Sequence, residues 1–189
     1  MIADLASHLG FAYYVGWLSA AARHGAAHHA PQVFQVAASR TVSARTVGRV
    51  RMEFHQRDRV TKVPTQLFRT YSGDVPLSTP AVTALDAATD LNLVGGLDNA
   101  ANIIIDLVGE ADLKAAEVAQ AAKWFPAASA RRVGWVMENL AGAPAMDALR
   151  DAVRPDRVPP SLLHPGHPRT GRTDRRWNLV INQEVEPDT

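Results

Sequence analysis

Charged side chains at every second position of one segment are the first residues in this chain whose spacing suits chemistry. The alternating positions are Arg49, Arg51, Glu53, His55, Arg57 and Arg59. In an extended strand such side chains share one face at intervals of roughly 6.5 to 7 Å, which suits successive phosphates or rows of carboxylates. The other interpretation is a solvated strand face, on which charges discourage edge-to-edge pairing with another sheet. The four arginines are therefore candidates for binding a partner, and both interpretations stay open.

A second candidate is a histidine group, His24, His28 and His29, because histidines four residues apart on one helical face can hold zinc. Gly25 interrupts the helical pattern between them, and no glutamate lies within the spacing. No third ligand is obvious, so we expect no metal site. His24 is better explained as a cation in the last turn of a helix, at the negative end of the helix dipole, and the other two as loop histidines.

Nucleotide chemistry would need a glycine-rich phosphate loop, a lysine and carboxylates that bind magnesium. The chain has neither a G-x-G-x-x-G nor a GK[ST] motif, and Gly95-Gly96 stands alone. An unorthodox catalytic site could use the carboxylates of Asp86 and Asp106 and the cation of Lys114, although exposed or helix-capping carboxylates are the simpler interpretation. We expect no cofactor, and ATP with magnesium would be required only by a kinase.

Two further functions find little support in the residues. Nucleic-acid binding through the arginine alternation lacks a stacking platform, because Phe54 falls on the opposite face by parity, and only nonspecific phosphate contact remains open. A Ser-His-Asp hydrolase is not indicated either, because Ser19 lies inside a predicted helix with no G-x-S-x-G turn around it.

The composition indicates one domain with an uneven charge distribution. A chain of 189 residues with 47% hydrophobic residues can bury a single core, and the lack of cysteine excludes disulfides and thiol catalysis. No apolar run approaches the roughly 20 residues that cross a bilayer, and no signal peptide is evident, so we expect a cytoplasmic protein. The net charge is +1, yet residues 40–69 carry eight basic and two acidic side chains, and residues 86–117 carry seven acidic and one basic. Such polarity can present one face to an anionic partner.

Hydrophobic periodicity predicts the elements that must position these residues. Apolar residues at helical spacing from Tyr14 to Ala22, followed by Gly25, predict an N-terminal helix. Alternation with a period of two predicts strands over residues 33–38, 49–55, 66–71 and 75–77. We expect a hairpin connection or a flexible loop between the first two strands, and a hairpin between the last two.

The second half of the chain is predicted to be mainly helical. Thr79 and Pro80 form a strong helix start, and Asp112 is a candidate cap for a later helix. Residues 155–176 are rich in proline and glycine, which predicts an irregular tether. Residues 177–185 alternate as a strand that returns to the sheet.

These elements predict a single mixed α+β domain over residues 1–189. A mainly antiparallel sheet with an N-terminal helix forms a sheet lobe from residues 1–79, completed by the returning strand at residues 177–185. Residues 80–154 form a helical lobe of about four helices, and the tether joins that lobe to the last strand.

Six stretches form an ordered set along the chain: YYVGWLSAAARHG, PQVFQVAASR, VRMEFHQR, LSTPAVTALDAATDLNLVGGLDN, ARRVGWVMENLAG and RWNLVINQEVEPD. In this order they resemble the C-terminal domain of AbiEi-type antitoxins, the antitoxin halves of bacterial type IV toxin-antitoxin and abortive-infection systems. The positions that match the family's motifs are Tyr14, Ser19, His24, Gly25, Phe34, Ser78, Pro80, Asp86, Gly96, Trp177 and Asn178. Typical members begin with a winged-helix DNA-binding domain, and few residues precede Tyr13 here, so operator binding is not expected.

The resemblance implies an antitoxin that counteracts a nucleotidyltransferase toxin of the AbiEii type. In that family a basic face is held responsible for neutralisation, and in this sequence the role falls on Arg49, Arg51, Arg57 and Arg59. The type IV label implies action without a stable toxin complex. The alternative from the enzyme class is an atypical serine/threonine kinase or phosphotransferase that inactivates the toxin by phosphorylation. A weaker alternative is a nonspecific nucleic-acid binder.

Overall fold

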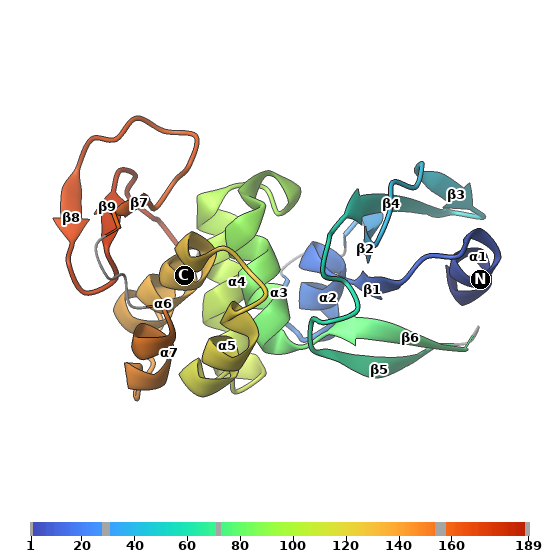
Figure 1. The fold of residues 1–189 in the computed structure, drawn as a ribbon, viewed down its shortest axis with the longest axis horizontal. Coiled ribbons are helices and arrows are strands. Elements are labelled where there is room, and N and C mark those ends of the chain that lie inside the picture. The colour runs from blue at the N-terminus through green and yellow to red at the C-terminus, as the bar shows by residue number, and fades with distance from the viewer. Residues whose placement is uncertain (1, 28–30, 71–72, 154–157, 188–189) are drawn as a thin grey trace.

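The computed structural model describes residues 2–27, 31–70, 73–153 and 158–187, which form two lobes (Figure 1). The sheet lobe contains a six-stranded sheet, and the helical lobe contains five α-helices and a 3-10 helix among the described residues. A separate three-stranded sheet lies on the far side of the helical lobe in Figure 1. The predicted α+β class is confirmed, and the helical lobe has slightly more helices than expected.

The strands of the large sheet are β1 (Tyr13–Val15), β2 (Val33–Ala38), β3 (Arg45–Val47), β4 (Val50–Gln56), β5 (Thr65–Thr70) and β6 (Gly73–Ser78). They lie in the order β3-β4-β2-β1-β6-β5. The pairs β1–β2, β3–β4 and β5–β6 are antiparallel, whereas β2–β4 and β1–β6 are parallel. The predicted hairpin in the second half of the sheet lobe is the β5–β6 pair; residues 71 and 72 between the strands lie outside the described residues.

The hairpin alternative for the connection between β2 and β4 is wrong. The two strands run parallel, in register from Val33 opposite Arg51 to Ala38 opposite Gln56, so the chain must cross back between them. During that return β3 forms a tight hairpin with β4 instead, through Gly48 at φ 62°. Local alternation identified the strands, but it carries no information about which neighbour each strand chooses.

The predicted N-terminal helix begins later than its apolar stripe suggested. Tyr14 belongs to β1, and the helix α2 covers only Trp17–Arg23. Gly16 is extended and Trp17 has a φ of 48°, so the chain turns sharply from strand into helix at these two residues. A further helix, α1 (Ile2–Leu9), precedes β1.

The elements of the helical lobe are α3 (Pro80–Thr89), the 3-10 helix η1 (Leu91–Leu93), α4 (Leu97–Glu110), α5 (Ala115–Ala122), α6 (Ala127–Asn139) and α7 (Asp147–Ala152). The central helix of this lobe is α3. Every side chain from Ala81 to Ala88 is buried, and α3 packs against α2, α4, α5 and α6. Across the described ranges, no helix combines the length and the apolar character that a bilayer span requires.

One of the two predicted helix starts is confirmed. Pro80 opens α3, and the Thr79 hydroxyl accepts a hydrogen bond from the Val82 N–H at 3.4 Å. The predicted cap at Asp112 is wrong, because α5 begins after Lys114, whose own N–H donates to the Glu117 carboxylate at 3.0 Å. A carboxylate in the first turn thus satisfies the backbone that Asp112 was expected to cap.

The end of the chain does not return to the large sheet. The strands β7 (Ser161–Leu162), β8 (Arg172–Asp174) and β9 (Leu179–Ile181) form their own sheet in the order β7-β9-β8. The predicted returning strand is therefore wrong, and the proline-rich segment supplies two short strands where an irregular tether was expected. The segment stays on the helical lobe because Trp177 is buried there and its Nε1 donates a hydrogen bond to Glu138 of α6 at 2.8 Å.

Candidate functional site

The arginine alternation starts at the outer edge of the large sheet. Arg49 lies in the turn between β3 and β4, and Arg51 lies on β4 with its side chain 62% exposed, 3.0 Å from the Glu53 carboxylate. Because β4 ends at Gln56, Arg57 and Arg59 follow the strand and do not extend its face. The four arginines therefore do not form one continuous row. Their role in binding a partner stays a prediction.

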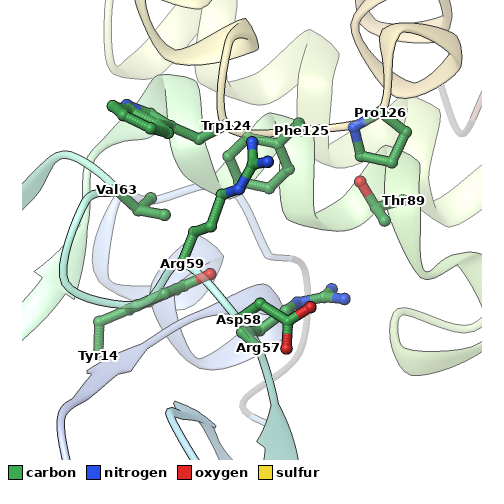
Figure 2. A pocket seen from close by; sticks show the side chains of 9 residues that line it. All are labelled: Tyr14, Arg57, Asp58, Arg59, Val63, Thr89, Trp124, Phe125 and Pro126. Carbon is green, nitrogen blue, oxygen red and sulfur yellow. The ribbon is translucent and has the colours of Figure 1, made fainter.

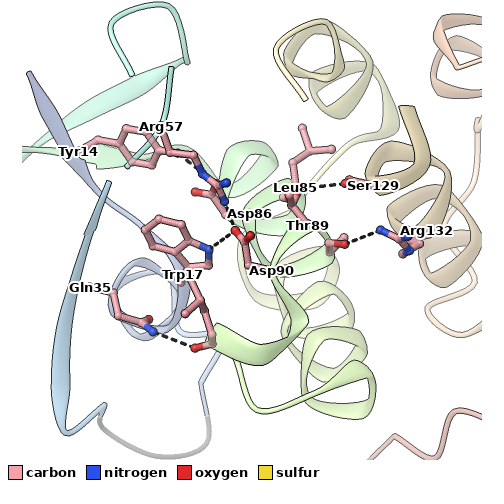
Figure 3. Close-up of polar contacts among 12 residues, drawn as sticks. Tyr14, Trp17, Gln35, Arg57, Leu85, Asp86, Thr89, Asp90, Ser129 and Arg132 are labelled. Atoms are coloured by element: carbon pink, nitrogen blue, oxygen red, sulfur yellow. Dashed lines mark hydrogen bonds and ion pairs between the residues drawn. The ribbon is translucent and has the colours of Figure 1, made fainter. Parts of the chain in front are cut away.

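The second half of the alternation packs against Trp17, between the lobes. The His55 ring lies edge-on to the Trp17 ring, with centroids 5.0 Å apart, and the Arg57 guanidinium carbon lies 5.2 Å from the centre of the same ring. Arg57 forms an ion pair with Asp90, and its Nη2 lies 4.0 Å from Oδ1 of Asp86 (Figure 3). Trp17 Nε1 donates to Oδ2 of Asp90 at 3.0 Å. Asp86 of α3 and Asp90, which follows the last residue of α3, thus hold a cation and an indole of the sheet lobe.

Asp86 is the buried centre of this network. Its side chain is fully buried, and its Oδ1 accepts a hydrogen bond from the Tyr14 hydroxyl at 3.1 Å. Burial raises the pKa of Asp86 to about 7, against the opposing effects of the Arg57 cation and the Tyr14 hydrogen bond. Burial also raises the pKa of Tyr14, so the hydroxyl keeps its proton and acts as the donor. A Cβ at Gly16 would lie only 3.0 Å from Oδ2 of Asp86, so the backbone of Gly16 closes one side of the carboxyl group.

Polar side chains behind the network tie β2 to α2 and to the helical lobe. The Gln35 amide accepts from the Leu18 N–H at 2.9 Å and donates to the Leu93 carbonyl at 2.8 Å (Figure 3). The Ser19 hydroxyl accepts from the Gln35 N–H at 2.8 Å and contacts the Val33 carbonyl at 3.3 Å. Ser19 therefore has a structural role, as its position inside a predicted helix suggested.

The other side of α3 is joined to the C-terminal sheet by Arg132 of α6. This buried guanidinium donates to the Ala88 carbonyl at 3.0 Å and to the Leu162 carbonyl at 3.0 Å. Burial lowers the pKa of Arg132 to about 10, so the side chain remains charged at neutral pH. One cation thereby satisfies a carbonyl near the end of α3 and a carbonyl of β7.

A cavity of about 410 Å³ opens beside the Tyr14, Asp86 and Arg57 network (Figure 2). It lies between the segment after β4, the end of α3 and the turn that joins α5 to α6. The side chains that line it are Tyr14, Arg57, Asp58, Arg59, Val63, Thr89, Trp124, Phe125 and Pro126. Figure 2 shows the Arg59 side chain reaching toward Trp124 and Phe125 on the opposite wall.

The three catalytic candidates lie in different environments. Asp86 is buried within α3, Asp106 is half-buried on α4, and Lys114 is exposed before α5, where it forms an ion pair with Asp112. Neither Asp106 nor Lys114 is among the residues that line the cavity. A catalytic role for these side chains stays a prediction.

The histidine group is described only at His24, because His28 and His29 lie outside the described residues. The Nε2 of His24 donates to the Ser78 carbonyl at 2.8 Å, and burial lowers the pKa of the ring. His24 is therefore neutral at neutral pH and ties α2 to β6 through a hydrogen bond, where a cationic helix partner was predicted. Within the described ranges, no group of three or more potential ligands gathers as a metal site.

Sequence reasoning missed Asp90 and the aromatic pair Trp124-Phe125. The pair had a usable signal, because two adjacent aromatic residues precede Pro126 at a break between helices in a chain with only 6% aromatic residues. Asp90 had none, since its partner Arg57 lies 33 residues earlier in the sequence and no local period connects the two.

The chain belongs to the AbiEi antitoxin C-terminal domain family, whose model matches residues 14–139. The matched span begins at Tyr14 and includes Arg57, Asp86, Asp90 and the aromatic turn at Trp124, so it contains the network and the cavity. The predicted membership is confirmed. It identifies residues 14–139 as an AbiEi antitoxin C-terminal domain.

The fold also resembles a solved structure, the crystal structure of RV2827C protein from Mycobacterium tuberculosis. The TM-score is 0.57 at 14% sequence identity, and the similarity covers 89% of this chain and 61% of the other. This chain thus spans about three fifths of the length of that protein. At this identity the likeness concerns the fold alone. No curated protein matches the chain.

Proposed function

We propose that this chain is the antitoxin of a type IV pair and neutralises a nucleotidyltransferase toxin of the AbiEii type through its basic hairpin. The basic hairpin consists of Arg45 on β3, Arg49 in the turn and Arg51 on β4. The family supports the antitoxin role. The observation that supports this surface as the functional one is its exposure: all three arginines are exposed at the edge of the large sheet. Under this proposal both proteins act in the cytoplasm.

The chemistry of the partner favours this surface. An enzyme that transfers nucleotidyl groups holds magnesium through carboxylates and therefore carries acidic side chains at its own site. Arginine recognises carboxylates through paired N–H donors, and a cluster of arginines accelerates encounter with an acidic surface. Arg57 is not part of the basic hairpin, because its charge is already paired with Asp90 inside the molecule.

The test is rescue of bacteria that express the toxin. We expect the double variant Arg49→Glu/Arg51→Glu to lose rescue while it keeps the circular dichroism spectrum and the thermal midpoint of the wild type. Both side chains are exposed, so the reversal changes the surface and leaves the packing intact. Growth is the appropriate readout because a type IV antitoxin acts without a stable toxin complex.

The matched control is Arg172→Glu/Arg175→Glu, which makes the same charge change at two exposed positions around β8. The control should still rescue growth. Unchanged rescue by the Arg49/Arg51 variant, or equal loss in both variants, would contradict a role for the basic hairpin. Transfer of label from ATP to the toxin by the purified antitoxin would instead favour the kinase alternative.

A further inference from the structure

The cavity between the lobes has the size and the lining of a small-molecule site. Its volume of about 410 Å³ lies within the usual range for ligand pockets. One wall carries the rings of Trp124 and Phe125. Arg57 and Arg59 come from the segment after β4, and the Arg59 guanidinium reaches across the cavity to these rings (Figure 2). A ligand that fills it would contact an aromatic surface and positive charge together.

Positive charge gathers around Trp124, at the aromatic wall of the cavity. Arg59 is exposed, and its Nη1 makes a long contact of 3.4 Å with the Lys123 carbonyl. The ammonium groups of Lys62 and Lys123 lie 5.8 and 5.2 Å from the centre of the Trp124 ring. Two lysine cations therefore flank the indole of Trp124, and the charged residues that line the cavity itself are Arg57, Arg59 and Asp58. This balance favours an anion with several oxygen acceptors.

Arg57 has one N–H donor that is not used in a hydrogen bond among the described residues. Asp90 and Asp86 hold the Nη2 side of Arg57, while its buried Nε has no hydrogen-bond partner among the described residues. An unsatisfied buried donor is costly, so Arg57, whose side chain lines the cavity, keeps an unused hydrogen-bonding capacity there. Because Arg57 is fixed by its ion pair and by Trp17, the group would be held in place before a ligand arrives.

We propose that this cavity binds a nucleoside phosphate, with the phosphoryl oxygens on Arg59 and the neighbouring lysines and the base against Trp124 and Phe125. A planar base suits an aromatic wall, and a phosphate suits guanidinium and ammonium donors. A purely apolar ligand would leave the cations without a role, and a bare anion would leave the aromatic wall without one. The ligand would touch both lobes, since Arg59 follows β4 and Trp124 follows α5.

The experiment is calorimetric titration of the full chain with ATP, GTP, CTP and UTP, with adenosine and pyrophosphate as the two halves of the ligand. We expect at least one nucleotide to bind more tightly than both adenosine and pyrophosphate. Arg59→Ala should weaken that binding about tenfold or more, as expected for loss of a hydrogen bond to a charged group. Trp124→Leu should weaken it as well, whereas Trp124→Phe should retain most of it.

The control variant is Arg172→Ala, which removes an exposed arginine of β8 and should bind as the wild type does. Absence of binding by all four nucleotides would overturn the proposal, and so would binding that survives Arg59→Ala and Trp124→Leu unchanged. Pyrophosphate that binds as tightly as the nucleotides would reduce the site to an anion site and refute the role of the base. Growth rescue tests the basic hairpin and titration tests the cavity, so either proposal can fail without the other.

Discussion

The carboxyl group of Asp86 is fully buried, and among the described residues it accepts one hydrogen bond, from Tyr14, which lies 72 residues earlier in the chain. Desolvation makes its charged form expensive, while the cation of Arg57 compensates in part. The residue is therefore poised between its two protonation states near neutral pH. Its neighbours are well defined: Tyr14 donates to it, Arg57 faces it, and the backbone of Gly16 lies against its second oxygen.

The raised pKa of Asp86 predicts that the free energy of unfolding depends on pH. The pKa of Asp86 is about 7 in the folded chain and 3.8 for an ordinary aspartate, so the native state binds more protons than the unfolded state between these values. Its contribution to the free energy of unfolding therefore falls as the pH rises from 3.8 to about 7 and is constant above that. Asp86→Asn should remove this slope, as measured by urea unfolding across that interval.

The comparison must be made as the difference between variant and wild type. Burial lowers the pKa values of His24 and His55. The contribution of such histidines to the free energy of unfolding falls as the pH falls, which is opposite to the effect of Asp86. The difference between the two proteins cancels their contribution. Parallel stability profiles for wild type and Asp86→Asn would show that Asp86 does not titrate in this range.

At the scale of elements, the C-terminal sheet is held on α6 by close packing of a tryptophan ring against a glycine. The ring of Trp177 lies directly on the backbone of Gly134 in α6, where an added Cβ would come within 2.1 Å of the ring. Trp177 is buried, and its Nε1 donates to Glu138 one turn further along the same helix. The absence of a side chain at Gly134 is thus what lets α6 accept the indole.

Gly134→Ala should destabilise the protein by about 1 to 3 kcal/mol, because the clash with Trp177 outweighs the higher helix propensity of alanine. The matched control is Gly109→Ala in α4, where an added Cβ would meet no atom within 4 Å. That substitution should be neutral or should stabilise by about 0.5 to 1 kcal/mol. Chemical unfolding of both variants measures the contrast, and equal effects would mean that Trp177 moves aside without cost.

Whether a segment forms a helix or a strand was easier to predict from the sequence than which other segment it pairs with or packs against. The alternation in β2 and β4 and the Thr79-Pro80 start of α3 are local signals, and the structure confirms them. The parallel pairing of β2 with β4 and the docking of Trp177 on α6 are contacts between distant segments, which no local period encodes. The same limit applies to the site, where the arginine alternation was visible but its division between sheet edge and lobe interface was not.

At the scale of the whole molecule, part of the charge polarity is used internally. The basic segment, residues 40–69, supplies Arg57, and the acidic segment, residues 86–117, supplies Asp86 and Asp90, and these side chains meet between the lobes. The ion pair with Asp90 is partly shielded from solvent and sits beside a fully buried carboxyl group. The arginines of the basic hairpin are exposed at the sheet edge, whereas Arg59 lines the cavity between the lobes.

Arg57→Ala should therefore lower the free energy of unfolding by about 1 to 3 kcal/mol, because it leaves the Asp86 and Asp90 carboxylates without their cation. Arg51→Ala removes an arginine from an exposed pair with Glu53 and should change stability by less than about 0.5 kcal/mol. Urea unfolding of the two variants tests the distinction. Equal and small effects would mean that the inner ion pair contributes no more than a surface one.

The position of β1 in the large sheet has a consequence for the order in which the protein assembles. This three-residue strand lies between β2 and β6, so it gains its second neighbour only when the chain as far as Ser78 is available. During synthesis the β2–β4 pair can form earlier, while β1 keeps an open edge until the β5–β6 hairpin has been made. Closure of the sheet and arrival of α3, which brings Asp86 to Tyr14, are then consecutive events. We therefore expect the nascent chain to be most exposed to misassembly before its central strand is enclosed.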